Sequence, residues 1–184
     1  MATDDDLGLD DNDDVTASVP QKKGGMGGLL PTLLKWIAII VGAIILIVTF
    51  CGHSQIYDKD TVRKRLTNEI HELLHAGYRN FYLGGYGDFD NLSAVVLDEL
   101  KSDWPDMERF LILPYLDKQV DTSMYDGILY PPLENVPKRF AISRRNKWMV
   151  EQSSVIVAYV DHGWGGAAKT LEYAVKKGLR IIRI

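Results

Sequence analysis

Three short turns rich in small residues constrain this chain most, because each is placed where a β-strand would hand over to a helix. They are Cys51–His53, Gly84–Asp90 and Gly163–Glu172. In an open parallel sheet the turns that follow the strands gather at one edge, where backbone N–H groups and helix N-termini face a shared crevice suited to phosphate. The sequence therefore predicts a domain that binds a nucleotide-like small molecule.

The composition limits the chain to one domain with a full hydrophobic core. It has 184 residues, 46% of them hydrophobic, and a formal net charge of -4; a chain of this size usually buries a single core. The negative charge argues against a surface that binds nucleic acid in general. The single cysteine, Cys51, excludes an intramolecular disulfide and fits a reducing compartment. We predict no metal and no cofactor, and we leave the oligomeric state open, a homo-oligomer included.

The first 28 residues have the composition of an acidic disordered tail. Seven aspartates fall between Asp4 and Asp14, and glycine and other small residues follow to Gly28. Such a segment lacks the apolar side chains that a packed core requires. We therefore predict disorder for residues 1–28.

A hydrophobic segment follows, and two interpretations of it compete. No Asp, Glu, Lys or Arg occurs from Trp36 to Tyr57, and about 20 such residues span a bilayer. We predict a transmembrane helix over 29–45, which would give a single-pass membrane protein with its globular domain in the cytoplasm. The alternative is a cytoplasmic protein whose hydrophobic leader spans nothing, because the β-branched end of the segment, 45–51, also fits a buried parallel strand.

Beyond Gly52 the pattern alternates between strand and helix, which is typical of an α/β fold. Helices are expected over 60–76 with Asp60 as the cap, from a cap at Asp90 to about Leu100, and over 138–152 and 167–177. Strands are expected over 45–51, 78–83, 110–113, 154–160 and 179–184. The proline-containing stretch from Tyr115 to Pro137 is expected to be a long loop. Residues 46–184 should thus form a Rossmann-like open parallel sheet of about five strands with helices on both faces.

The turns supply the candidate ligand-binding residues. Glycines let the backbone approach an anion, and the helix that follows aims its positive end at the same place. The candidates in the turns are Gly52, His53, Gly84, Gly85, Gly87, Gly165 and Gly166. Asp88 and Glu172 are candidates for ribose hydroxyls, and Arg145 and Asn146, on the basic helix over 138–152, for the crevice itself. The competing interpretation is that tight turns need glycine anyway and that the charged residues form a solvated helix face.

One metal motif is visible in the sequence. His71-Glu72-Leu73-Leu74-His75 matches the H-E-x-x-H pattern, in which two imidazoles one helical turn apart bind zinc and the glutamate acts as a general base. The predicted helix ends at Gly77 and leads directly into a strand, and no convincing third ligand follows. A surface histidine pair is therefore favoured over a zinc hydrolase.

Six segments carry a family resemblance: Phe50–His53, Asn80–Asp90, Leu113–Tyr115, Tyr130–Glu134, Arg144–Met149 and Trp164–Ala168. In this order they resemble the SLOG superfamily, and within it the YpsA-like branch, over about residues 48–184. The resemblance implies a Rossmann-like fold related to the DprA and LOG proteins. It also implies binding of nucleotides or nucleotide-derived signals.

The resemblance leaves an enzymatic alternative open. In LOG nucleotide phosphoribohydrolases an arginine and a glutamate carry cleavage of the N-glycosidic bond, and Arg145 fits that arginine. The glutamate motif departs from the family pattern, because Trp164 replaces a proline, Ala168 replaces a glycine and Glu172 lies one residue further on. We therefore favour a binding module over a hydrolase. A third interpretation, a flagellar or membrane scaffold, rests on the resemblance of the leader over 22–37 to the anchor of FliL-type proteins.

Overall fold

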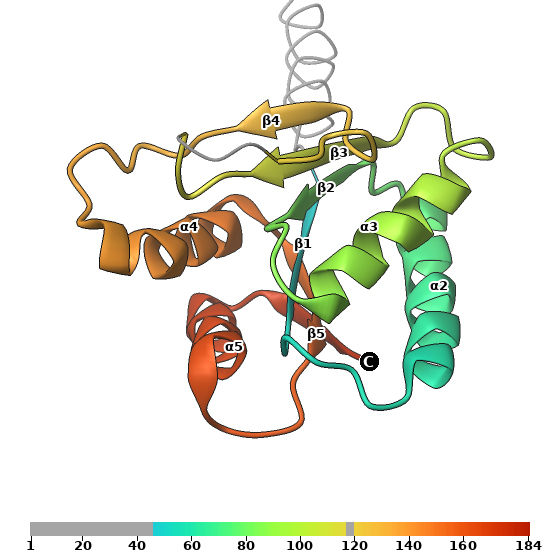
Figure 1. Cartoon of the computed structure of the whole chain (residues 1–184). Coiled ribbons are helices and arrows are strands. Elements are labelled where there is room, and N and C mark those ends of the chain that lie inside the picture. Colours follow the sequence, from blue (N-terminus) through green and yellow to red (C-terminus); the bar gives the residue numbers. More distant parts are fainter. Residues whose placement is uncertain (1–45, 117–119) are drawn as a thin grey trace, which may run out of the picture. The chain divides into compact units, whose positions relative to one another are not determined.

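A six-stranded parallel sheet runs through the part of the chain that the computed structural model describes, residues 46–116 and 120–184 (Figure 1). The elements are β1 (Ile47–Gly52), α2 (Lys59–His75), β2 (Asn80–Leu83), α3 (Asp88–Leu100), β3 (Glu108–Ile112), β4 (Gly127–Leu129), α4 (Lys138–Gln152), β5 (Val155–Tyr159), α5 (Gly165–Lys177) and β6 (Arg180–Arg183). This architecture confirms the predicted Rossmann-like α/β fold, with six strands in place of about five. The predictions for the acidic tail over 1–28, the transmembrane helix over 29–45 and the leader over 22–37 lie outside the described residues.

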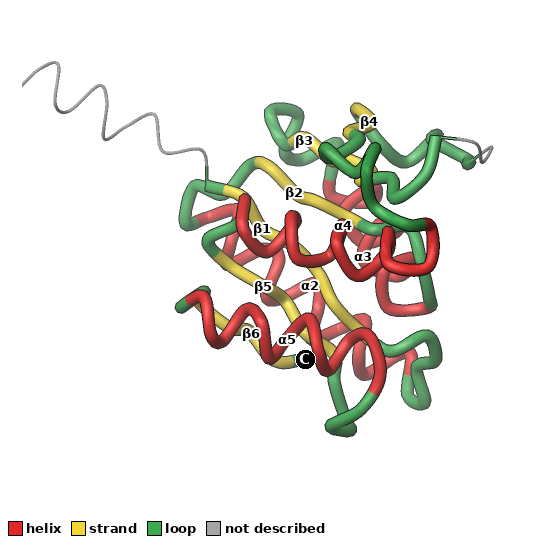
Figure 2. The backbone as a smooth tube through the Cα atoms, turned by 90° about the vertical axis from the view of Figure 1, so that its left-hand side faces the viewer, coloured by secondary structure: helices red, strands yellow, loops and turns green. Residues whose placement is uncertain are grey.

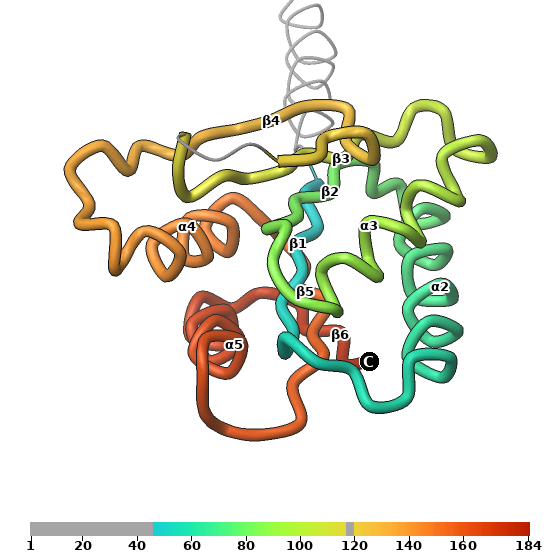
Figure 3. Tube along the Cα trace, in the orientation of Figure 1, coloured from blue at the N-terminus to red at the C-terminus, as the bar shows by residue number. Residues whose placement is uncertain are grey.

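The strand order β4-β3-β2-β1-β5-β6 places β1 where the chain changes direction across the sheet. From β1 the chain steps to β2, β3 and β4 on one side, and it then returns to pair β5 with the other edge of β1 (Figure 3). In open α/β sheets a crevice forms outside the carboxyl ends of the strands at such a switch point. A ligand site is therefore expected beside the ends of β1 and β5.

Two pairs of helices cover the two faces of the sheet. Helix α2 packs with α3, and α4 packs with α5. The pairs lie on opposite sides of the strands in Figure 1, and Figure 2 shows α4 and α5 in front of the sheet with α2 behind it. The predicted placement of helices on both faces is confirmed. Right-handed crossovers put α2 and α3 on one face while the chain moves away from β1 in one direction, and α4 and α5 on the other face when the direction reverses.

The side chains of β1 point alternately to the two faces of the sheet and so contribute to two separate hydrophobic clusters. Val48 and Phe50 belong to the cluster built with α2 and α3, whereas Cys51 belongs to the cluster built with α4 and α5. Successive side chains of a strand point to opposite faces, so a strand covered on both sides reads as a continuous apolar run. From Ile47 onward, the run that competed with a membrane helix in the sequence is the central strand of the sheet.

Two predicted helix caps are wrong. The cap of α2 is Asp58, whose Oδ1 accepts a hydrogen bond from the Thr61 backbone N–H at 3.1 Å, so Asp60 lies in the first turn instead. Helix α3 begins after Gly87, whose φ of +88° favours glycine. Asp90 lies inside this helix and is buried. Several residues near the start of each helix could serve as its N-cap. The direction in which the chain enters the helix decides which of them does.

The predicted long loop between Tyr115 and Pro137 contains a strand. Gly127–Leu129 form β4, which pairs in parallel with β3 in the register Phe110↔Gly127. Asp126 fixes this register, because its carboxylate accepts from the Arg109 backbone N–H at 2.9 Å and its own N–H donates to the Arg109 carbonyl at 2.8 Å. Three residues are too few to show the alternating hydrophobic pattern of a strand, so the sequence did not predict β4.

The predicted single-pass membrane localisation is wrong for the described part of the chain. Spanning a bilayer takes about 20 consecutive apolar residues, and no helix within 46–116 or 120–184 is long and apolar enough. The longest of them, α2, has 17 residues and includes charged side chains at Lys59, Arg63 and Lys64.

Candidate ligand-binding cleft

A cleft of about 570 Å³ opens beyond the carboxyl ends of β1, β2 and β5, where the strand order places the switch point. Eight of the predicted site residues line it: Gly52, His53, Gly84, Gly87, Arg145, Asn146, Gly165 and Gly166. They come from the end of β1 and the turn after it, from the turn after β2, from α4 and from the start of α5. The fold thus brings together residues that the sequence singled out separately.

Three predicted residues do not line this cleft. Gly85 has a φ of +71°, and a side chain there would meet Leu111. Asp88 is exposed, and its backbone N–H donates to the Ser54 carbonyl at 3.1 Å. Glu172 is exposed and lines a second cavity, of about 460 Å³.

The turn after β2 is already occupied by a carboxyl group of the protein itself. The Asp90 carboxylate turns back from α3 and accepts a hydrogen bond from the Tyr86 backbone N–H at 3.1 Å. Burial raises the pKa of Asp90, although the charge of Arg145 and the hydrogen bonds from Tyr86, Gly84 and Gly85 oppose that rise. An internal carboxylate therefore takes the position at which the glycine pattern had predicted phosphate. The sequence did not predict this position for the Asp90 side chain.

Arg145 lies buried in the lining of the cleft, with 2% of its surface exposed. Its Nη1 donates to the carbonyl oxygens of Gly84 and Ile112, at 2.5 and 2.7 Å. Its Nε has no hydrogen-bond partner among the described residues. Burial lowers the pKa of this guanidinium and Asp90 opposes the shift. Gly84 is required beside it, because a Cβ there would approach Nη1 to 2.6 Å. Arg145 thus locks the turn after β2 and places a positive charge in the lining.

The first turn of α5 faces the cleft without a side-chain cap. Trp164 precedes the helix and makes no capping hydrogen bond, so the first N–H groups keep the donor capacity of a free helix N-terminus. Gly165 has a φ of +92°, and a Cβ at Gly165 or Gly166 would meet nothing within 4 Å. Neighbouring atoms therefore do not demand glycine at position 166. Asn146 joins this helix to α4, because its Nδ2 donates to Thr170 Oγ1 at 3.2 Å.

Two histidines and an aspartate meet at one end of the cleft. His53 follows β1, and Asp161 and His162 follow β5. His53 Nε2 lies 2.8 Å from Asp161 Oδ1, and His162 Nε2 lies 3.6 Å from the same oxygen. Burial and the neighbouring His162 lower the pKa of His53, while Asp161 opposes them. The sequence singled out His53 but not Asp161 or His162, because these three residues do not follow the spacing of a known motif.

The H-E-x-x-H histidines lie elsewhere. His71 and His75 lie on α2, and neither lines the cleft. Their ring centroids are 6.4 Å apart, and His75 packs edge-on against Trp104. The pair is a feature of the helix, separate from the cleft.

Comparison with known proteins identifies the fold. No protein-family model and no curated protein matches the sequence. Among solved structures, TM1055 matches at 17% identity with a TM-score of 0.51, over 74% of this chain and 72% of that one. The molybdenum cofactor carrier protein from Chlamydomonas reinhardtii matches at 14% identity with a TM-score of 0.53, over 75% of each chain. DNA processing protein A (DprA) from Helicobacter pylori matches at 16% identity with a TM-score of 0.55, over 76% of this chain and 65% of that one.

The described domain has a SLOG-type fold. At identities of 14 to 17% the likeness establishes the architecture of the SLOG-type domain and nothing about its chemistry. It confirms the fold expected from the six ordered segments. The FliL-type resemblance of the leader is not supported by these structures.

Proposed function

We propose that the SLOG-type domain binds a nucleotide or nucleotide-derived small molecule in the cleft at the ends of β1, β2 and β5. The observation that carries the proposal is the uncapped N-terminus of α5, which opens into the same cleft as the buried, positively charged Arg145. Backbone N–H donors and a helix dipole favour a phosphate group at this end. The anionic group of the ligand is therefore assigned to Gly165 and Gly166, and not to the turn that Asp90 already fills.

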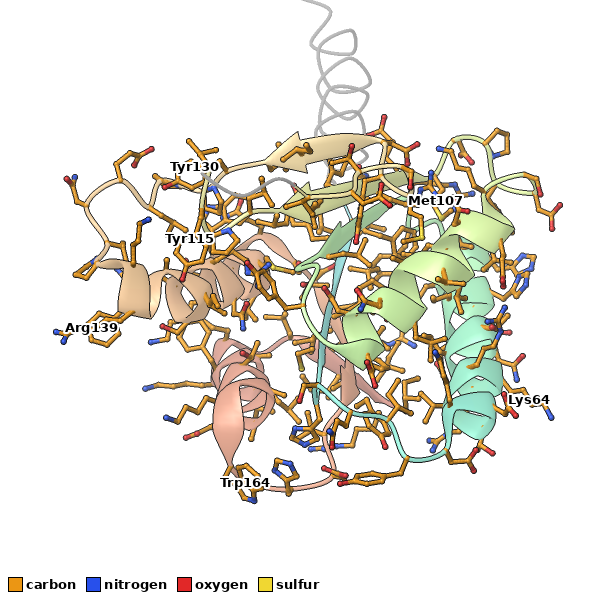
Figure 4. The ribbon with its side chains drawn as sticks, in the orientation of Figure 1. Lys64, Met107, Tyr115, Tyr130, Arg139 and Trp164 are labelled. Carbon is orange, nitrogen blue, oxygen red and sulfur yellow. The ribbon has the colours of Figure 1, made fainter. Side chains whose placement is uncertain are left out.

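Aromatic side chains on the rim suit the base of such a ligand. Trp164 and Tyr57 both line the cleft and are 72% and 83% exposed, and Figure 4 shows Trp164 on the loop that leads into α5. An exposed aromatic face stacks on a nucleobase without selecting its identity. Two structural neighbours fit this class of ligand, since one is a carrier of the molybdenum cofactor and another was solved to explain a single-stranded DNA binding mode.

Binding without cleavage is the function that the geometry favours. A LOG-like hydrolase would need Glu172 and Arg145 on one ligand. Glu172 lines the second cavity, whereas Arg145 lines the cleft and donates its Nη1 hydrogens to two backbone carbonyl groups. The scaffold interpretation rests on the leader, which lies outside the described residues.

Thermal unfolding of the full chain tests the proposal against a panel of nucleoside monophosphates, dinucleotides and ADP-ribose derivatives. A ligand present at 100 times its Kd should stabilise the fold by about 2.7 kcal/mol, seen as a saturable rise in Tm. The variant Gly166→Ala adds a methyl group in front of the proposed phosphate position, so we expect at least about tenfold weaker binding, or about 1.4 kcal/mol.

Gly163→Ala is the matched control. Gly163 also has open space around its Cα, but it lies in the second cavity and outside the cleft. We expect this variant to bind as the wild type does. The proposal fails if no member of the panel moves the Tm, or if the two alanine variants weaken binding equally.

A further inference from the structure

The group formed by His53, Asp161 and His162 has the composition of a transition-metal site. Each residue offers one donor atom, and these atoms lie within 4.8 Å of one another. No other group of three such donors is found within 46–116 and 120–184. Imidazole nitrogen and carboxylate oxygen are the donors that zinc and neighbouring divalent metals accept in proteins.

Two nitrogen atoms of this group, one on each imidazole, have no hydrogen-bond partner within the described residues. His53 Nε2 and His162 Nδ1 are both buried and make no hydrogen bond to any described residue. His53 Nε2 lies 2.8 Å from Asp161 Oδ1, yet this contact is not aligned as a hydrogen bond. Buried polar atoms are rarely left unpaired. A cation bound between His53 Nε2 and Asp161 Oδ1 would give both atoms a partner.

The donors lie close to the spacing that a metal ion requires. Metal–donor bonds of about 2.0–2.2 Å in a tetrahedral arrangement place neighbouring donors roughly 3.3–3.6 Å apart. The 3.6 Å between Asp161 Oδ1 and His162 Nε2 falls in that range. The 2.8 Å between Asp161 Oδ1 and His53 Nε2 is shorter, so these two atoms would move apart around a bound ion.

We propose that His53, Asp161 and His162 bind one divalent transition-metal ion of the zinc class at the edge of the cleft. Three protein ligands leave a fourth position for water or for an oxygen of a bound molecule. That position would open toward the cleft, which all three residues line. The metal site stands on its own residues and does not depend on the ligand proposed above.

Metal binding requires one side chain to turn. His162 is stacked between His53 and Trp164, with ring centroids 3.6 and 3.9 Å away. The lone pair of an imidazole nitrogen lies in the ring plane, so two stacked rings do not aim at one point. The side chain of His162 is 33% exposed, which leaves room for its ring to rotate toward Asp161. Rotation would remove it from the face of Trp164 and change the emission of that indole.

Cobalt(II) titration of the full chain tests the site. We expect one ion per chain, visible absorption bands of a four- or five-coordinate cobalt centre, displacement by zinc, and a change in tryptophan emission that is absent in Trp164→Phe. His162→Ala and Asp161→Asn should each weaken cobalt binding at least about tenfold. The Asp161 side chain is 42% exposed, so Asp161→Asn should leave the unfolding transition unchanged and report on the metal alone.

The histidine pair on α2 provides the control. His71 and His75 are spaced one helical turn apart and are the remaining histidines of the chain. The double variant His71→Ala/His75→Ala should retain the cobalt spectrum and affinity of the wild type. The proposal is overturned if the wild type shows no cobalt bands at millimolar metal, if His162→Ala and Asp161→Asn both bind as the wild type does, or if the double variant loses the site.

Discussion

Glycine has two different uses around the cleft. At Gly52 the surrounding protein leaves no room, because a Cβ would lie 2.4 Å from the ring of Phe89, which is fully buried. At Gly166 the surroundings are open. Gly52 is therefore required by the packing of the core. The open space at Gly166, beside a helix N-terminus, is available to a ligand. Sequence analysis could not separate these uses, since both positions show only a glycine in a turn.

The two glycines predict opposite responses to the same change. Gly52→Ala should lower the free energy of unfolding by about 1–3 kcal/mol, because the methyl group overpacks the core against Phe89. Gly166→Ala should change it by less than about 0.5 kcal/mol. Urea denaturation of both variants measures the difference. Equal losses would contradict this account of the cleft glycines.

Cys51 should be unreactive in the folded protein. Burial raises the pKa of its thiol to about 12. The charge of Asp90 adds a smaller increase, and the charge of Arg183 opposes it. At pH 8 only about one thiol in 10⁴ is then ionised, and the thiolate is the reactive form. We expect Ellman's reagent to label the native chain at least about 10³-fold more slowly than the chain in guanidinium. Because the chain has one cysteine, the absorbance reports a single site, and fast native labelling would show that β1 opens.

At the scale of elements, β4 depends on charges more than on apolar contacts. Its exposed and half-buried residues offer little hydrophobic area. Arg109, 5% exposed, donates from Nε to Asp126 at 3.0 Å and from Nη1 to Asp98 at 2.6 Å. The residue before β4 is therefore tied to β3 by side-chain and main-chain bonds together. Hydrophobic periodicity predicts most strands, but it cannot predict a strand that is held by ion pairs and hydrogen bonds.

Asp126→Asn tests this arrangement. Removing the carboxylate leaves the buried Arg109 partly unpaired, so unfolding should become easier by about 1–3 kcal/mol at pH 7. Glu108→Gln, an exposed change on β3 next to Arg109, should cost less than about 0.5 kcal/mol. Equal effects of the two variants would show that the Arg109 network does not hold β4.

The effect of Asp126→Asn should also depend on pH. Burial raises the pKa of Asp126, but the hydrogen bonds from Arg109 outweigh it and the net shift is downward from 3.8. The depressed value means that the unfolded chain takes up the proton first, so this contribution to stability is complete above about pH 4 and is lost as pH falls through the folded pKa. The difference between wild type and variant should therefore shrink below pH 4. Urea denaturation at pH 7 and pH 3 measures it.

Most elements of the fold could be predicted, but their ends could not. The helices and five of the six strands follow from apolar periodicity and from glycine and proline at the turns. The cap of α2 at Asp58 instead of Asp60, and the burial of Asp90 inside α3, depend on how the chain enters each helix. That entry is set by packing against the sheet, so local sequence leaves it undecided.

At the scale of the whole molecule, residues 46–184 contain every strand of the described sheet and both hydrophobic clusters. We expect a chain of these residues to unfold cooperatively and at the same urea midpoint as the full chain, because its core is complete. Denaturation followed by circular dichroism measures both midpoints. A lower midpoint, or a broad transition, would show that residues 1–45 contribute to the fold and that the predicted domain boundary is wrong.

The sequence by itself determined the α/β class, the three turns and eight of the residues that line the cleft, because periodicity and turn chemistry are local properties of the chain. Tertiary structure alone decided what those residues do. It placed the Asp90 side chain in the turn predicted to hold phosphate, put the first turn of α5 and Arg145 in the lining of one cleft, and brought His53 beside Asp161 and His162. Most of these groups lie far apart along the chain. The pairing of β5 with β1 brings the residues that follow the two strands side by side, and the packing of α4 with α5 brings Arg145 and the start of α5 to the same cleft.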